Sequence, residues 1–189
     1  MSRSDRGGRP FITRQSAAKL PQTNNRRGET MPSRRNMIAM TDEEAKEFIE
    51  TGWTLQVASN GNNGFPHMVA MWYGVIDDKI HFTTYAKAQK VLNLKRDPRI
   101  TVMLESGVEY SKIKGLVIEG EADVIENDPQ LVMAVQDATG EKRNPNAQGR
   151  SSTPMDDEQR VRQASKRAVV RINPTRVYSW DHEKLGGVY

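Results

Sequence analysis

The sequence predicts a mainly β protein, a small barrel of about six antiparallel strands with short helices in the connections. Apolar residues recur in short runs with the period-two alternation of half-buried strands. In the run 112–126, for example, Ile118, Ala122 and Val124 alternate with acidic residues. The helical patterns between these runs are short. We therefore expect an antiparallel barrel and not a βαβ fold.

The first predicted element is a helix that begins after Thr41 and runs to Glu50. The sequence TDEE forms a capping-box pattern, in which Thr41 is the N-cap and Glu44 follows three residues later. Gly52 is expected to end the helix.

A meander of three strands is expected next. The first strand covers 53–59, the turn GNNG covers 61–64, and a long second strand covers 66–76. Two aspartates then connect it to a third strand that begins at Lys79. In a meander the second and third strands would be hydrogen-bonded neighbours.

The remaining chain alternates between helical and extended patterns. Gly115, Gly120 and Pro174 are expected to mark bends or bulges, because a curled sheet needs them and proline cannot donate a ladder hydrogen bond. The elements expected here are a short helix around 89–95, strands at 99–106 and 112–126, helices at 130–138 and 156–166, a polar loop at 139–154 between these two helices, and a final strand at 167–181.

Composition indicates one domain and limits its chemistry. The chain has 189 residues and no cysteine, which excludes disulfides, thiolate metal sites and a cysteine nucleophile. No apolar run approaches the roughly 20 residues that cross a bilayer, and no secretory signal is recognisable, so we expect a cytoplasmic protein without a membrane partner.

Positive charge is concentrated in the first 36 residues, which hold nine Lys or Arg and two Asp or Glu, leaving the rest of the chain with a net charge of −3. This segment has few apolar residues, so we expect a disordered basic extension at 1–36 and a folded domain at 37–189. Its arginines are compatible with nucleic-acid binding. We consider nucleic acid an unlikely partner, because the domain lacks interleaved basic and aromatic residues.

The most informative segment is KIHFTTYAKAQKVLNLKRDP, residues 79–98, in which a predicted strand leads directly into a short helix. Thr83, Thr84 and the free N–H groups of the first helical turn could converge on an anion, with Lys87 or Lys90 supplying charge. The alternative interpretation is that the lysines are the solvated face of an amphipathic helix. The first interpretation predicts a phosphate site.

Other kinds of site lack support. His67, His81 and His182 lie in separate segments without a second ligand at metal-binding spacing, so no metal site is expected. Neither a G-x-S-x-G elbow nor a G-x-G-x-x-G loop after a strand is present. The chemistry is therefore expected to come from a bound molecule.

The segment PHMVAMWY, residues 66–73, is extended and rich in Met, Trp and Tyr, which suits a flat heterocycle. Its side chains must alternate, so Met68, Ala70 and Trp72 share one face, and Val69, Met71 and Tyr73 share the other. Core packing is the alternative role for each of them.

These segments resemble one family. The sequence is similar to the pyridoxamine-phosphate-oxidase-like split β-barrel superfamily, and more narrowly to its coenzyme F420-dependent (flavin/deazaflavin oxidoreductase, B-type) branch. The resemblance covers roughly residues 37–189 and rests on PHMVAMWY, DDKIHFTT, AKAQKVLNLKRDPR, LVIEGEADVIEN and NPTRVYSWDHEKLGG.

The resemblance implies a split β-barrel homodimer with two cofactor sites at the subunit interface. It further implies that ring-lining residues, phosphate-binding residues and pocket-closing residues come from three segments. These are, in that order, His67, Val69 and Met71; then Thr83, Thr84, Lys87, Lys90 and Asn93; then Trp180 and Lys184.

The chain departs from true pyridoxamine-phosphate oxidases. Their Ser-Arg-Lys motif is replaced by Ala88-Gln89-Lys90, and their Arg-Leu-x-Pro terminus by residues 185–189, LGGVY. The resemblance therefore implies an F420-dependent oxidoreductase that transfers a hydride to an unsaturated small molecule. FMN is the alternative cofactor, in an oxidase or reductase, and a non-catalytic flavin- or haem-binding protein is a further alternative. No catalytic acid is evident, and His67, Tyr73 or solvent could supply a proton.

Overall fold

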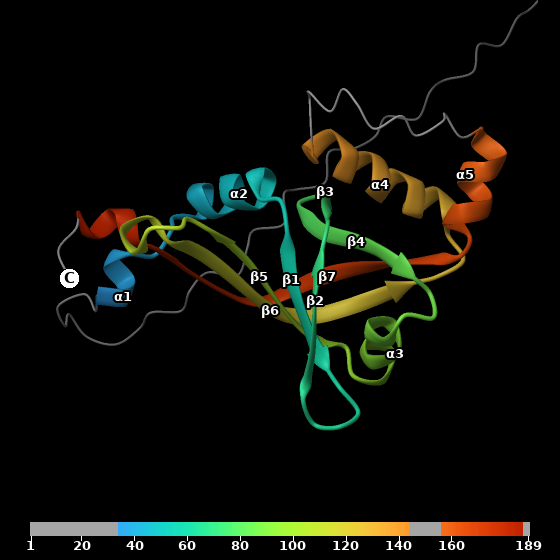
Figure 1. Ribbon diagram of the computed structural model, residues 1–189, viewed down its shortest axis with the longest axis horizontal. Coiled ribbons are helices and arrows are strands. Elements are labelled where there is room, and N and C mark those ends of the chain that lie inside the picture. Colours follow the sequence, from blue (N-terminus) through green and yellow to red (C-terminus); the bar gives the residue numbers. More distant parts are fainter. Residues whose placement is uncertain (1–33, 144–155, 187–189) are drawn as a thin grey trace, which may run out of the picture.

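The fold is a single curled antiparallel sheet, seen in the computed structural model, which describes residues 34–143 and 156–186 (Figure 1). Its strand order is β2-β1-β5-β6-β7-β4-β3. The strands are β1 (Leu55–Asn60), β2 (Pro66–Met71), β3 (Gly74–Ile76), β4 (Lys79–Tyr85), β5 (Arg99–Ser106), β6 (Lys114–Ile125) and β7 (Arg167–Asp181). The predicted split β-barrel architecture, mainly β with short helices, is confirmed.

Short helices lie at the two ends of the sheet. Helices α4 and α5 lie together near β3 and β4, whereas α2 and η2 lie near the other end of the long strands (Figure 1). The helices are α1 (Arg34–Met37), α2 (Asp42–Thr51), α3 (Gln89–Arg96), η1 (Tyr110–Lys112), α4 (Pro129–Arg143), α5 (Asp157–Ala164) and η2 (His182–Leu185). Among the described residues, no helix is long and apolar enough to cross a membrane. The expected basic extension lies outside the described residues, apart from its last three, which belong to α1.

Helix α2 begins as its sequence predicts. Thr41 Oγ1 accepts a hydrogen bond from Glu44 N (3.2 Å), and Thr41 N donates to Glu44 Oε2 (2.7 Å), which completes the capping box. Gly52 N donates to Phe48 O (3.0 Å) and ends the helix. Ala45 and the apolar residues beside it pack on the main core.

The long strand expected at 66–76 is interrupted, which corrects the predicted meander. The chain leaves β2 after Met71 and resumes as β3 at Gly74; β2 pairs with β1 at one edge of the sheet, and β3 pairs with β4 at the other. Between them the ring of Tyr73 is buried in the core, and its hydroxyl donates to Ile49 O (2.6 Å). Helix α4 packs so closely on Gly74 that an added Cβ would lie 2.9 Å from the Cβ of Ala138. These contacts carry the chain across the core, so β2 and β4 are not neighbours.

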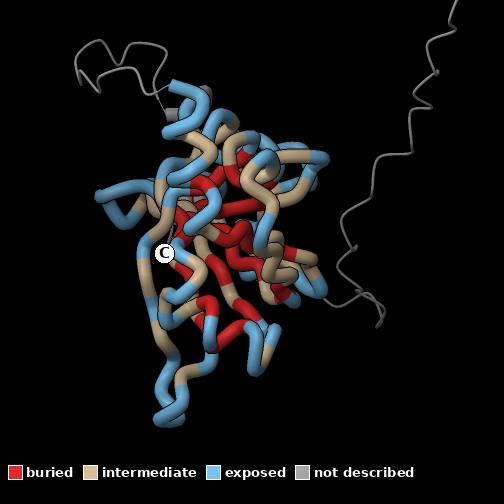
Figure 2. Tube along the Cα trace, turned by 90° about the vertical axis from the view of Figure 1, so that its right-hand side faces the viewer, coloured by how far each residue is buried: buried red, intermediate tan, exposed pale blue. Residues whose placement is uncertain are grey.

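The buried residues gather in the interior of the molecule, and the exposed ones lie around them (Figure 2). The main core contains Leu55, Val57, Phe82, Leu104 and Ile172, each at most 2% exposed. A second cluster lies under α4, where Val132 and Val135 meet Ala164 and Val169. The two clusters cover both faces of β7 and fix the position of β4 beside it.

A β-bulge bends the β6–β7 ladder. Glu119 pairs with Arg176 and Gly120 pairs with Pro174, so Thr175 has no partner in the ladder. The expected irregularity at Gly120 and Pro174 is confirmed. Gly115 is regularly paired instead, and it is small because the Trp180 ring covers it: an added Cβ would lie 2.0 Å from Trp180 Cζ2.

The loop predicted at 139–154 is shorter at its start, because α4 continues to Arg143. Within this extension the hydroxyl of Thr139 donates to Val135 O (2.6 Å), one turn earlier on the same helix. Residues 144–155 of the predicted loop lie outside the described residues.

Candidate functional site

The centre of the candidate site is Lys90, on the first turn of α3. Its side chain is half-buried, and its Nζ donates to Thr84 Oγ1 (3.0 Å). Burial lowers the pKa of Lys90 from that of an ordinary lysine. In the described part of the chain, no carboxylate lies within ion-pair distance of it. A half-buried ammonium group with only a hydroxyl beside it is a site for an anion.

Helix α3 is fixed to the sheet by a buried polar relay. Asn93, fully buried, donates through Nδ2 to Ser59 Oγ on β1 (3.2 Å), and its Oδ1 accepts from Gln89 Nε2 (2.9 Å). Both functional atoms of the Asn93 amide are therefore already engaged within the protein. The relay sets the position of α3, and with it the position of Lys90.

His67 faces the same side of the sheet as Ser59, its partner on β1. Its Nδ1 is shielded from solvent, and no described residue forms a hydrogen bond with it. A buried nitrogen in this state needs a partner. The predicted ring-lining residues Val69 and Met71 follow on the same face of β2 and are half-buried.

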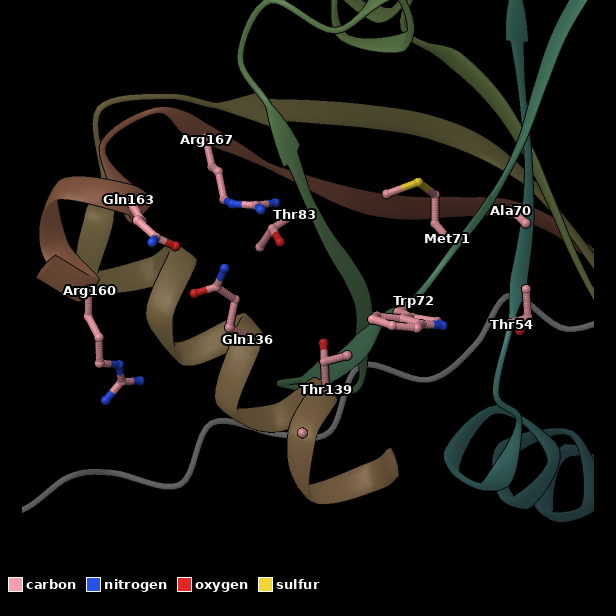
Figure 3. Close-up of a pocket in the computed structure, with 11 residues that line it drawn as sticks. Thr54, Ala70, Met71, Trp72, Thr83, Gln136, Thr139, Arg160, Gln163 and Arg167 are labelled. Carbon is pink, nitrogen blue, oxygen red and sulfur yellow. The ribbon is translucent and has the colours of Figure 1, made fainter. Parts of the chain in front are cut away.

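Thr83 and Thr84 do not act as a pair. They alternate on β4, so Thr84 points toward Lys90, whereas Thr83 opens into a cavity of about 600 Å³ on the other side of the strand. Met71 also lines this cavity (Figure 3). Lys87 is exposed and lies in no described hydrogen bond or ion pair with the cluster.

Trp180 and Lys184 lie at the far end of the molecule. Thr84 pairs with Ala168 on β7, and Trp180 comes twelve residues later on the same strand, about 40 Å away if the strand were straight. Lys184 Nζ donates to Ala39 O (2.8 Å) and contacts Glu44 Oε2 (2.5 Å). One chain therefore does not bring these two residues to Lys90.

Tyr73 is not placed to donate a proton to a bound molecule. Its hydroxyl is buried in the core with the backbone of α2, and burial raises the pKa of Tyr73 well above its ordinary value.

Sequence reasoning missed three residues. Gln89 is four positions before Asn93, a spacing that places both on one helix face and could have indicated the pair. Ser59 carries no such signal, because its contact with Asn93 spans 34 residues. Arg167 lines the cavity because β7, which it begins, pairs with β4. Its guanidinium lies 4.7 Å from the centre of the Tyr85 ring.

The curled antiparallel sheet, with a short helix α3 directly after β4, defines a split-barrel protein. Residues 41–181 match the sequence profile of the family described as pyridoxamine 5'-phosphate oxidase, and the chain belongs to this family. None of the curated proteins compared with the chain matches it.

Solved structures share the fold. A conserved hypothetical protein from Mycobacterium tuberculosis is 35% identical, with a TM-score of 0.69 over 84% of this chain and 95% of that one. A putative 5-nitroimidazole antibiotic resistance protein from Bacteroides thetaiotaomicron is 14% identical, with a TM-score of 0.59 over 75% and 85%. An F420 reductase is 19% identical, with a TM-score of 0.51 over 70% of this chain and 94% of that one. The last two show the fold alone.

Proposed function

We propose that this protein is an F420-dependent oxidoreductase that transfers a hydride to an unsaturated small molecule. The observation that carries the proposal is the half-buried Lys90, which has Thr84 beside it and no described carboxylate partner. Within the described residues no carboxylate balances its charge, and a phosphate-bearing cofactor would balance it. The F420 reductase among the structures that share the fold, and the resemblance of 37–189 to the F420-dependent branch, support this choice of cofactor.

The residues present fit such a cofactor. Lys90 and Thr84 would hold the phosphate, and His67, whose buried Nδ1 has no described partner, would donate to or accept from the same molecule. Val69 and Met71 would line its ring. Asn93 would position α3, since its fully buried amide contacts Ser59 and Gln89.

Bound F420 would supply the hydride. The chain itself would orient the two reactants and exclude water from them, which are the contributions that a scaffold makes to cofactor chemistry. Tyr73 is buried in the core, so the accompanying proton would come from His67 or from solvent.

A homodimer would complete the site. Trp180 and Lys184 are too far from Lys90 in one chain, but a second copy could bring them to it. Trp53, Met68 and Trp72 are each more than half exposed, an unusual position for large apolar side chains. We propose that the partner copy covers part of this surface and contributes its own C-terminal residues to the cofactor site.

FMN is the second candidate cofactor, because its phosphate would suit the same lysine and hydroxyl. A FAD-binding protein from Mesorhizobium loti shares the fold, with a TM-score of 0.54 at 12% identity. A haem storage protein from Vibrio cholerae also shares it, with a TM-score of 0.52 at 19% identity. A non-catalytic ligand-binding protein is therefore a third outcome of the test.

The test is a fluorescence titration of the purified full chain with F420 and, separately, with FMN. We expect tight F420 binding and weak FMN binding, and a loss of F420 affinity of about tenfold or more in Lys90→Ala. Lys95→Ala is the matched control, because Lys95 lies on the same helix and pairs with Glu126 instead of facing the Lys90 cluster. Preference for FMN would move the protein to the flavin enzymes, and binding of neither cofactor would refute the proposal.

A further inference from the structure

The cavity beside Thr83 is distinct from the Lys90 cluster. Its volume is about 600 Å³, within the usual range for small-molecule sites. Helices α4 and α5 form one wall, and the ends of β2 and β4 form the other (Figure 3).

Hydrogen-bond donors dominate the helical side of the cavity. Gln136 comes from α4, Gln163 comes from α5, and Arg167 begins β7. Gln163 and Arg167 lie on the same side, and the guanidinium of Arg167 points toward Thr83 (Figure 3). No aspartate or glutamate is among the lining residues.

The two arginines of the cavity differ in what they can bind. Arg160 is held by an ion pair with Asp137 (2.8 Å) and points away from the other lining residues (Figure 3). Arg167 packs over the Tyr85 ring, and within 34–143 and 156–186 it forms no ion pair. The charge of Arg167 is therefore available to a ligand, and its planar guanidinium suits a carboxylate.

The opposite wall is apolar. Ala70, Met71 and Trp72 line it, and Trp72 is 53% exposed. An indole ring and a thioether beside a donor-rich wall would accommodate a flat, unsaturated body whose polar end faces the helices.

We propose that this cavity binds a flat unsaturated carboxylic acid, with its carboxylate on Arg167 and its apolar body against Trp72. Identifying this molecule as the hydride acceptor rests on the proposed function, since Met71 lines the cavity and would also line the cofactor ring. The binding itself does not require the cofactor.

The experiment is isothermal titration calorimetry of the full chain, without cofactor, with cinnamate and with the neutral cinnamamide as probes. Cinnamate should bind more tightly than cinnamamide. Arg167→Gln should weaken cinnamate binding about tenfold or more and leave cinnamamide binding unchanged. Trp72→Ala should weaken the binding of both probes, and because Trp72 is exposed this variant should fold normally.

The matched control is Arg162→Gln, because Arg162 lies on α5, is exposed, and pairs with Glu158 outside the cavity. It should bind both probes as the wild type does. Equal binding of cinnamate and cinnamamide, no binding of cinnamate, or an unaffected Arg167→Gln variant would overturn the inference. Cinnamate binding in a protein that fails to bind F420 would overturn the proposed function alone.

Discussion

Burial of the Lys90 ammonium group has a cost in free energy that the binding of an anion can offset. Removing an ammonium group from water disfavours its charge, and only a ligand of opposite charge recovers the loss. Its neighbour Thr84 is a neutral hydroxyl, so among the described residues the charge of Lys90 has no carboxylate to balance it.

The lowered pKa of Lys90 predicts how cofactor affinity depends on pH. Anion binding requires the charged lysine, so the affinity for F420 should have its full value below the pKa of Lys90 in the free protein. It should fall as the pH rises through that pKa, which lies below the ordinary value of about 10.4. In Lys90→Arg the guanidinium stays charged, so the decline should disappear. F420 titrations of the wild type and of Lys90→Arg between pH 7 and 10 give the affinity of each at every pH. The ratio of the two affinities is the quantity to compare, because ionisation of the cofactor affects both proteins equally. Parallel declines would show that Lys90 is not the titrating group.

Asn93 supports the site from behind. Asn93→Ala removes two hydrogen bonds and leaves Ser59 and Gln89 without their partner, so we expect a loss of roughly 2–3 kcal/mol in the free energy of unfolding. Leu92→Ala is the matched control on the same helix, because Leu92 is half exposed, and it should cost much less. Urea denaturation measures both. A fully stable Asn93→Ala protein would show that the relay does not hold α3.

Local signals made some residues predictable. The association of Thr84 with Lys90 follows from a strand that runs directly into a helix, since six residues separate them. Ser59 and Arg167 could not be predicted, because their roles depend on which strands become neighbours.

Among the elements, the helix caps were predictable and the strand order was not. Thr41 and Glu44 determine the start of α2 by themselves. Alternation in 66–76 correctly placed Val69 and Met71 on one face and Met68 on the other. A period of two reveals faces but not neighbours, so it could not show that β2 and β3 belong to opposite edges of the sheet.

The β6–β7 pair offers a test of close packing. Gly115→Ala would place a methyl group against the Trp180 ring, so the ring must move, and we expect a loss of about 1–3 kcal/mol in stability. Tryptophan fluorescence should change with it. Gly140→Ala is the control, because nothing lies within 4 Å of the added methyl group and alanine favours a helix. Unchanged fluorescence in Gly115→Ala would contradict the described contact.

For the whole molecule, the separation between Lys90 and Trp180 predicts complementation between damaged copies. Lys90→Ala and Trp180→Ala should each bind F420 poorly. In a dimer with shared sites, a mixed pair carries one doubly defective site and one intact site. Co-expression of the two variants should therefore restore about a quarter of the wild-type binding capacity, measured by stoichiometric titration. A mixture that binds no more than its parents would exclude sites shared in this way.

The unpaired Thr175 changes which side of β7 faces the interior. Before it, Val170 and Ile172 point into the core; beyond it, the core-facing position passes to odd-numbered residues, beginning with Val177. If Thr175 occupied a regular position in the ladder, strict alternation would exchange the orientations of Val177 and Trp180. The bulge instead keeps Val177 opposite Ile118 and Trp180 opposite Gly115. Deleting Thr175 would therefore remove the bulge and leave Val177 and Trp180 on their present sides of the strand.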